Sequence, residues 1–366
     1  NMRYKLDEFT AIQQKALTGA RLSFTDAIQL YAKASILDLA EWARAAKERH
    51  SQKNVYYNIN RHINLSNTCT ASCPLCAFSV EAGDKSGYIL SLDKIASIVK
   101  DARSNAAGLT EIHIVSSLCP DIKFSYYIDV LRTVKDILPD IHIQAFTPVE
   151  IVYFAKISGL TIREVLQQLQ AAGLSSLPGG GAEILVDRVR RIVSPKKIMT
   201  DDWLNIMRCA HKIGMKTTAT MVLGLGETIE ERIEHMDKIR TLQDETGGFR
   251  AFIMWTFQPG HTKLGGKKLS SWEYLKTLAV SRLYFDNISH IQGSWVTQGK
   301  NIGQMTLAFG ADDLGSIMLE ENVVRAAGTS HHMSVNTMSD IIKKADKIPA
   351  QRDTEYNIIK PAANNH

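Results

Sequence analysis

Three cysteines stand close together in this chain, at Cys69, Cys73 and Cys76. Thiolates are soft ligands that suit zinc, copper and iron–sulfur clusters. Three thiolates can hold a four-iron cluster by three of its irons, which leaves the fourth iron open to another molecule. The spacing Cys-x3-Cys-x2-Cys therefore predicts a metal centre with one reactive position.

A structural zinc site is the main alternative, because zinc is usually held by four protein ligands in closed pairs. No fourth cysteine is near, since the other two are Cys119 and Cys209. His62 could complete a tetrahedron, but we expect it to lie on the far side of a predicted strand. A disulfide framework is disfavoured because the chain has an odd number of cysteines, 5. An iron–sulfur cluster is the favoured interpretation.

The elements that position the cysteines change type near Lys53. Two helical patterns precede it, at 6–17 and 23–46. After it, short apolar runs alternate with amphipathic helices, which is typical of parallel βαβ units. Several of these helices begin with capping boxes, at Thr161, Thr228 and Ser270. We expect strands at 61–65, 111–116, 142–146, 175–177, 217–223, 251–256, 292–296 and 306–309.

Eight such strands predict an α/β fold, a (β/α)8 TIM-type barrel with an N-terminal helical extension and a short C-terminal tail. The expected divisions are residues 1–52 for the extension, 53–315 for the barrel, and 316–366 for helices and a tail that pack on it. Functional residues of such barrels follow the carboxyl ends of the strands. The cysteine run follows the first strand, as an active-site loop would.

Composition excludes some functions. The chain is 45% hydrophobic and 22% charged with a net charge of +5, and no basic run stands out, so we expect no nucleic-acid partner. It has no apolar stretch long enough for a bilayer and no signal-peptide pattern. We therefore expect no membrane partner and a cytoplasmic location, where thiols stay reduced.

The cysteine run followed by Ala77 and Phe78 resembles the cluster motif of the radical S-adenosylmethionine (SAM) enzymes. In that family the cysteines hold a [4Fe-4S] cluster, and the open iron chelates the amino and carboxylate groups of SAM. The resemblance implies an external one-electron reductant of the flavodoxin or ferredoxin type and release of a 5′-deoxyadenosyl radical. The protein then binds, orients and shields the reactants.

Cofactor contacts are predicted after several strands. Three glycines from Gly179 onward can form a nest of N–H donors. The segment that begins at Gly224 resembles one that contacts adenine and ribose in the biotin-synthase-like branch of the family. Ser116 is placed to meet the amino group of SAM. The full set of predicted cofactor contacts is Phe78, Ser116, Ser117, Gly179, Gly180, Gly224, Glu227 and Gln258.

Substrate contacts are expected at the barrel mouth, where aromatic and polar groups suit a flat aromatic ligand. Glu150 and Glu183 are candidate catalytic bases, or else carboxylates held by arginine or backbone N–H groups. His331 and His332 are expected to be solvated or gating residues. The predicted substrate contacts are Asn64, Thr147, Trp255, Trp295 and Gln298.

Longer segments resemble the futalosine-pathway enzymes of menaquinone biosynthesis, at 176–184, 242–249 and 352–357. Segments similar to the dehypoxanthine futalosine cyclase dominate the second half, and segments similar to aminofutalosine synthase dominate the first. By the count and length of matching segments we expect cyclisation of dehypoxanthine futalosine. The alternative is addition of the adenosyl radical to 3-[(1-carboxyvinyl)oxy]benzoate. Either implies a small aromatic carboxylate or nucleoside as substrate.

Three positions depart from these patterns. Cys119 and Leu225 stand where histidines follow strands two and five in the resembled families, and Ser79 stands where the cyclases have tyrosine. Cys119 and Leu225 either replace functional histidines or leave those roles vacant. A non-catalytic iron–sulfur paralogue is therefore the hypothesis from another class.

Overall fold

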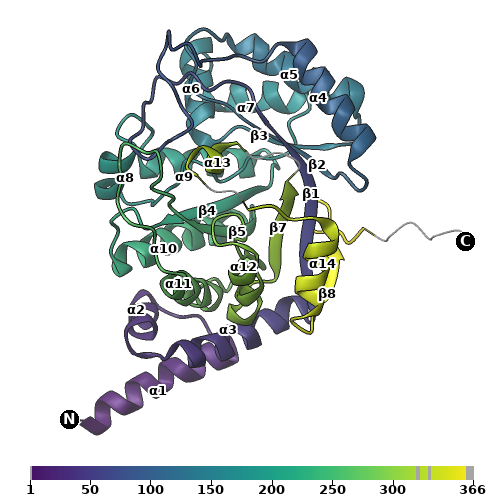
Figure 1. Cartoon of the computed structure of the whole chain (residues 1–366). Coiled ribbons are helices and arrows are strands. Elements are labelled where there is room, and N and C mark those ends of the chain that lie inside the picture. Colours follow the sequence, from purple (N-terminus) through teal and green to yellow (C-terminus); the bar gives the residue numbers. More distant parts are fainter. Residues whose placement is uncertain (1, 319–321, 329–330, 360–366) are drawn as a thin grey trace, which may run out of the picture.

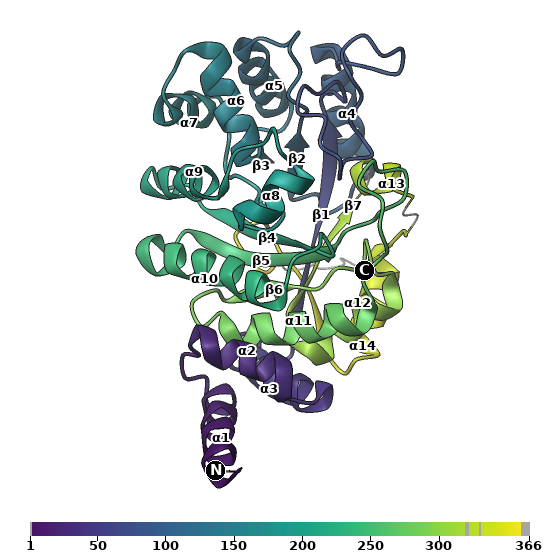
Figure 2. The same ribbon diagram turned by 90° about the vertical axis from the view of Figure 1, so that its left-hand side faces the viewer.

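The computed structural model describes residues 2–318, 322–328 and 331–359. Its centre is a parallel sheet wound into a barrel, with most helices outside it (Figures 1 and 2). The strands are β1 (Asn54–Asn64), β2 (Glu111–Val115), β3 (His142–Ala145), β4 (Thr217–Leu223), β5 (Phe249–Thr256), β6 (His290–Gln292), β7 (Asp313–Met318) and β8 (Ile348–Gln351).

The strand order confirms the TIM-type barrel. Strands run β3-β2-β1-β7-β6-β5-β4, and β8 pairs with the first residues of β1. The two edges, β3 and β4, are joined by a short segment in which Ser176 bridges Gln144 and Leu177 bridges Thr217. The predicted strand at 175–177 is therefore present only as these two bridges, and they complete the ring.

The helices cover the outer face of the sheet, and most follow the strands in βα order. The cap predicted at Thr161 is a full capping box, as is the one at Thr228, and Ser270 also caps its helix. The helices are α1 (Met2–Thr18), α2 (Phe24–Lys33), α3 (Ile36–Ser51), α4 (Leu92–Asn105), α5 (Phe124–Ile137), α6 (Pro148–Ser158), α7 (Ile162–Ala171), α8 (Asp187–Val193), α9 (Thr200–Lys212), α10 (Ile229–Thr246), α11 (Ser271–Tyr284), α12 (Lys300–Thr306), α13 (Val323–Ala326) and α14 (Val335–Lys343).

The N-terminal extension α1–α3 lies against the outer helices α10 and α11 (Figure 1). Buried polar contacts hold it there, such as the Tyr31 hydroxyl on Thr277 at 3.0 Å. The helix predicted over 23–46 is in fact two helices. The chain breaks at Ser35, whose side chain accepts from the Asp38 N–H and starts α3.

The strand predicted at 306–309 is wrong. This apolar run continues α12 as a short 3₁₀ turn, η1 (Leu307–Phe309), which ends at Gly310 with φ of 95°. The true last barrel strand is β7, and β6 ends at Gln292, before most of the strand predicted over 292–296. The Thr306 run is apolar because it packs on α3, outside the barrel.

The barrel has an apolar outside, and its lumen carries polar side chains among apolar ones. Side chains alternate along β1, so that Ile59 and Ile63 are buried in the apolar core. Asn60 and His62 face the opposite way and line a cavity. Barrel interiors are usually filled by branched apolar side chains. A lumen that holds a cavity and carries polar side chains therefore indicates a ligand site.

No helix of the described chain is both long and apolar enough to cross a lipid bilayer.

Candidate active site

A cavity of about 460 Å³ occupies the lumen, within the size range of small-molecule sites. The cysteine loop after β1 lies at its carboxyl-terminal end, as barrel active sites do. The C-terminal tail after β8 contributes Arg352, Thr354 and Tyr356 to the wall. The cavity thus extends from the cysteines down to the tail.

The cysteine loop is held by backbone hydrogen bonds. The Cys76 N–H donates to Cys73 O at 3.0 Å, and the Cys69 N–H donates to Val80 O at 2.9 Å. The Leu118 N–H donates to Cys69 Sγ at 3.4 Å, so the loop after β2 already contacts one sulfur. All three thiols are free and line the cavity.

The donor set fits a cluster better than a zinc ion. Among the described residues, no three His, Cys, Asp or Glu side chains converge on a point where one metal ion could sit. Zinc requires such convergence, whereas a [4Fe-4S] cluster spreads its thiolates over different irons. The described side chains therefore show no preformed zinc site.

Electrostatics favour a positive partner beside Cys73. Burial raises the pKa of this thiol to about 11, while the Lys197 ammonium acts in the opposite direction. Lys197 also lines the cavity and donates to Glu183 Oε1 at 2.7 Å. Burial alone would lower the pKa of Lys197, but the Glu183 carboxylate outweighs it and raises that pKa above its ordinary value. Lys197 is therefore a fixed cation close to the cysteines.

Eleven of the predicted site residues meet on this cavity. Among them, Ser117 has a buried hydroxyl with no hydrogen-bond partner among the described residues, so it is available to a ligand, whereas the Ser116 hydroxyl lies beside the Tyr127 hydroxyl. The residues that meet are Asn64, Cys69, Cys73, Cys76, Phe78, Ser116, Ser117, Thr147, Glu150, Gly180 and Trp255.

The other predicted residues lie off the cavity wall, and their functional roles stay predictions. Glu227 accepts from the N–H groups of Gly224 and Leu225 at 3.0 and 2.7 Å, which fixes the turn after β4. Gln298 donates to the Thr256 hydroxyl at 2.6 Å. The set is Gly179, Glu183, Gly224, Glu227, Gln258, Trp295 and Gln298.

The two candidate catalytic carboxylates have structural partners. Glu150 accepts from the Ser116 N–H at 2.7 Å and from the Thr147 N–H at 2.8 Å, so it ties the serine loop to the start of α6. Glu183 is paired with Lys197 and lies 3.6 Å from Arg190 Nη1. These contacts match the alternative role that the sequence left open for both residues.

Glu150 gives a pH prediction. Burial raises its pKa to about 7, despite the donors from Thr147 and Ser116. Because the ordinary value is lower, the folded protein keeps a proton that the unfolded chain loses between about pH 4.5 and 7. The free energy of unfolding should therefore fall by about 2 kcal/mol between pH 5.5 and 7.5.

Glu150→Gln should remove most of this pH dependence, because the amide does not titrate. Urea denaturation at the two pH values measures it for both proteins. An equal pH difference in wild type and variant would contradict the assignment of the proton to Glu150.

Sequence reasoning missed two lumen histidines. His62 does not lie on the far side of its strand: it lines the same cavity as the cysteines and stacks on His113, with ring centroids 4.5 Å apart. Burial and the neighbouring His113 lower the pKa of His62 to about 3, so it is neutral at physiological pH. The alternation of Asn58, Asn60, His62 and Asn64 along β1 was the available signal.

The histidines expected from the resembled families are not replaced at the wall. Cys119 and Leu225 are packed in the apolar core, and neither lines the cavity. The wall instead carries His62 and His113 from lower in the barrel. Among the described residues, the imidazoles on the wall therefore come from β1 and β2.

The cations of the lumen are each paired with a carboxylate. The rest of the wall combines amides, hydroxyls, imidazoles and the carboxylates of Glu111 and Glu150 with a larger share of apolar side chains, such as Val115 and Ile253. Among the described residues, the cations on the wall and their partners are Lys197 with Glu183 (2.7 Å), Arg250 with Glu355 (2.6 Å) and Arg352 with Asp313 (2.7 Å).

Two family models match the chain. Residues 63–239 match the radical SAM superfamily, and residues 246–365 match the CofH/MqnC C-terminal region. The first range contains the cysteine loop, and the second contains the tail that reaches the cavity.

Curated relatives with three different names are similar to nearly the whole chain. Cyclic dehypoxanthine futalosine synthase of Halalkalibacterium halodurans is 42% identical over 95% of this chain and 94% of its own. Aminodeoxyfutalosine synthase of Thermus thermophilus is 38% identical over 95% of each chain. The 5-amino-6-(D-ribitylamino)uracil–L-tyrosine 4-hydroxyphenyl transferase of Methanococcoides burtonii is 40% identical over 88% of this chain and 92% of its own.

Among solved structures, the FeFe-hydrogenase maturase HydG from Carboxydothermus hydrogenoformans superposes with a TM-score of 0.76. It is 20% identical and covers 97% of this chain and 82% of its own, which supports the fold alone.

Proposed function

The chain belongs to the radical SAM superfamily, and on that premise we propose that Cys69, Cys73 and Cys76 hold a [4Fe-4S] cluster with SAM on its open iron. When bound, the cluster and SAM supply a 5′-deoxyadenosyl radical. Ser116 and Ser117 then hold the polar groups of SAM, since both line the cavity and the buried Ser117 hydroxyl has no partner among the described residues. The electron comes from a flavodoxin- or ferredoxin-type reductant in the cytoplasm.

The proposed reaction is the cyclisation of dehypoxanthine futalosine, a step of menaquinone biosynthesis. The uncharged hydrogen-bonding side chains of the lumen below the cysteines carry this choice. A nucleoside-derived substrate has sugar hydroxyls and one aromatic carboxylate, and amides, hydroxyls and imidazoles suit the hydroxyls. Trp255 lies on the wall and offers a face for the aromatic ring.

The alternative substrate, 3-[(1-carboxyvinyl)oxy]benzoate, suits this lumen less well. It has two carboxylates and no hydroxyl, and a buried carboxylate needs a cation or several donors. The wall cations, Lys197, Arg250 and Arg352, each already have a carboxylate partner. A dianion would therefore compete with three existing ion pairs.

In the proposed reaction the chain's own residues bind, orient and shield. The lumen side chains hold the sugar so that one ribose C–H faces the cysteine end of the cavity. The enclosed barrel keeps water and oxygen from the carbon radical until it attacks the aromatic ring. Glu150 and Glu183 serve these steps by fixing Ser116 and Lys197 in place.

The test is anaerobic reconstitution with SAM, a reductant and one substrate at a time, followed by mass spectrometry. The substrates are dehypoxanthine futalosine, 3-[(1-carboxyvinyl)oxy]benzoate, and ring-labelled tyrosine with the ribitylaminouracil named for the third relative. We expect free 5′-deoxyadenosine and a cyclised nucleoside product with the first substrate only.

The other outcomes separate the alternatives. Adenosyl carbon in the product would show the synthase reaction instead of the cyclase reaction. Transfer of the ring label from tyrosine would show the transferase reaction instead. Failure to cleave SAM with a reduced, fully loaded cluster would favour the non-catalytic paralogue.

A further inference from the structure

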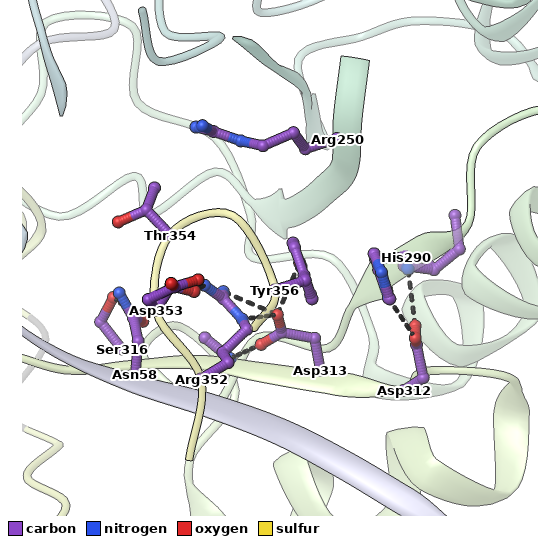
Figure 3. Close-up of polar contacts among 12 residues, drawn as sticks. Asn58, Arg250, His290, Asp312, Asp313, Ser316, Arg352, Asp353, Thr354 and Tyr356 are labelled. Atoms are coloured by element: carbon purple, nitrogen blue, oxygen red, sulfur yellow. Dashed lines mark hydrogen bonds and ion pairs between the residues drawn. The ribbon is translucent and has the colours of Figure 1, made fainter. Parts of the chain in front are cut away.

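The C-terminal tail forms a turn across the end of the barrel opposite the cysteines. Arg352 and Ile358 pair as an antiparallel bridge, so residues 352–358 fold back on themselves. Figure 3 shows this turn between Arg250 at the start of β5 and Asp313 at the start of β7. The turn also contacts Glu111, the first residue of β2. It therefore closes the amino-terminal end of the lumen.

Buried contacts anchor the turn. Arg352 Nε and the Tyr356 hydroxyl both donate to Asp313 Oδ2, at 2.7 and 2.6 Å. The Tyr356 ring also stacks on His290, with centroids 3.6 Å apart and planes 2° from parallel. Asp313 is fully buried, so these donors satisfy a charge that would otherwise be costly. The turn is thus held in one position.

One hydrogen-bonded chain leads from the turn into the lumen through Glu111. The Thr354 hydroxyl donates to Glu111 Oε2 at 2.9 Å. Asn60 Nδ2 donates to Glu111 Oε1 at 3.0 Å. Thr354 therefore orients a lumen amide through one carboxylate.

A second chain leads from the turn to His113. Glu355 accepts from Arg250 Nη1 at 2.6 Å, and Arg250 Nη2 donates to Gln144 Oε1 at 2.8 Å. The Gln144 Nε2 lies 3.3 Å from His113 Nδ1. Three side chains thus connect the turn to the stacked histidine.

The second chain sets the tautomer of His113. A guanidinium can only donate, so the oxygen of the Gln144 amide must face Arg250, and its NH₂ group must donate to His113 Nδ1. Nδ1 is then an acceptor, and the proton lies on Nε2. Glu111 Oε1 is the competing partner of Nδ1, but at 3.5 Å it lies farther away than the Gln144 amide nitrogen at 3.3 Å.

The His113 side chain is partly exposed inside the barrel. It keeps 15% of its surface exposed, and it lines the cavity. No described residue accepts from Nε2. The Nε2–H is therefore a donor that a ligand in the lumen can use.

We propose that His113 binds an uncharged oxygen acceptor of the substrate, such as a sugar hydroxyl or ring carbonyl, and that the C-terminal turn is the element that positions it. This inference rests on the proposed function for the substrate and on the structure alone for the tautomer. His113 is a substrate-binding residue. Gln144 and Arg250 are positioning residues for His113, and Thr354 positions the neighbouring Asn60 amide through Glu111.

The tautomer is measured first, because it needs no substrate. ¹⁵N-histidine NMR of the cluster-loaded protein, assigned by comparison with His113→Gln, should show the proton on Nε2. Gln144→Glu should move it to Nδ1, because the new carboxylate accepts where the amide donated. A proton on Nδ1 in the wild type would overturn the proposal.

Kinetics then test binding. His113→Leu should raise KM for the substrate about 10-fold or more, because the oxygen acceptor of the substrate is then buried without a donor. His113→Gln, which keeps an N–H donor, should restore most of the affinity. Thr354→Val should raise KM more than it lowers kcat, since Thr354 orients the Asn60 amide through Glu111. An unchanged KM in His113→Leu would overturn the proposal.

Glu48→Gln is the matched control for Glu355→Gln. Both glutamates are 41–46% exposed and pair with a cation, Glu48 with Lys347 at 2.9 Å and Glu355 with Arg250 at 2.6 Å. Only Glu355→Gln should raise KM. An equal rise in both variants would count against the series of hydrogen bonds from Glu355 to His113. If the wild type converts none of the offered substrates, the proposed function fails, and the NMR result still decides the tautomer.

Discussion

Cys73→Ser should abolish reductive cleavage of SAM, with a loss of at least about 1,000-fold. Serine is a hard, weakly acidic ligand that does not replace a cluster thiolate. Of the three motif cysteines, Cys73 is the buried one, and the other two are only partly buried. Water cannot easily take its place in the coordination shell. Iron and sulfide analysis, visible absorption and 5′-deoxyadenosine yield measure the effect after anaerobic reconstitution.

The matched control is Cys209→Ser. Cys209 is a free cysteine on α9, away from the cavity wall, so iron content and SAM cleavage should stay at wild-type levels. Circular dichroism should show that both variants fold. A Cys73→Ser protein that keeps a full cluster and cleaves SAM would contradict the assignment of the three ligands.

The fold could be predicted where short-range patterns decide it. The Thr161 and Thr228 boxes are local hydrogen bonds between residues three apart, and both formed as expected. The strand β7 was missed because it begins at Asp313, directly after Asp312, and two adjacent aspartates look like a turn. The partners that make two buried aspartates tolerable, Arg282 and Arg352, are far away in the sequence.

In the candidate site, too, local patterns could be predicted and long-range contacts could not. The three candidate cluster cysteines lie close together at 69, 73 and 76, so their spacing alone was enough to predict them. The lower lumen is assembled from single residues on different strands and closed by a tail, as in the contact of Thr354 with Glu111, which are 243 positions apart. No window along the chain contains both partners. Only the alternation of polar residues on β1 pointed toward the lumen.

A second large effect is expected on stability. Asp312→Ala should lower the free energy of unfolding by about 3–5 kcal/mol, because it leaves the buried Arg282 guanidinium without its counter-charge. Both side chains have 0% exposure, and Arg282 Nη2 lies 2.5 Å from Asp312 Oδ1. The Ile291 N–H, at 2.8 Å, loses its acceptor as well. Denaturant unfolding measures the loss.

The pH dependence of that loss identifies its cause. Burial acts to raise the pKa of Asp312, but Arg282 and His290 outweigh it and hold that pKa below its ordinary value near 3.8. A lowered folded-state pKa contributes stability above the ordinary value, and this contribution is lost as pH falls. The difference in the free energy of unfolding between wild type and Asp312→Ala should therefore become smaller below about pH 4.

Lys263→Ala is the contrasting control, because it removes an ion pair with Glu81 in which both side chains are 74% exposed. Its cost should stay within about 0.5 kcal/mol, since water already screens the pair. Equal losses in Lys263→Ala and Asp312→Ala would mean that burial of the charge is not what makes Asp312 costly to remove. A gap between wild type and Asp312→Ala that stays constant below pH 4 would point instead to the lost packing of the side chain. The charge argument requires both a large cost at neutral pH and its decline in acid.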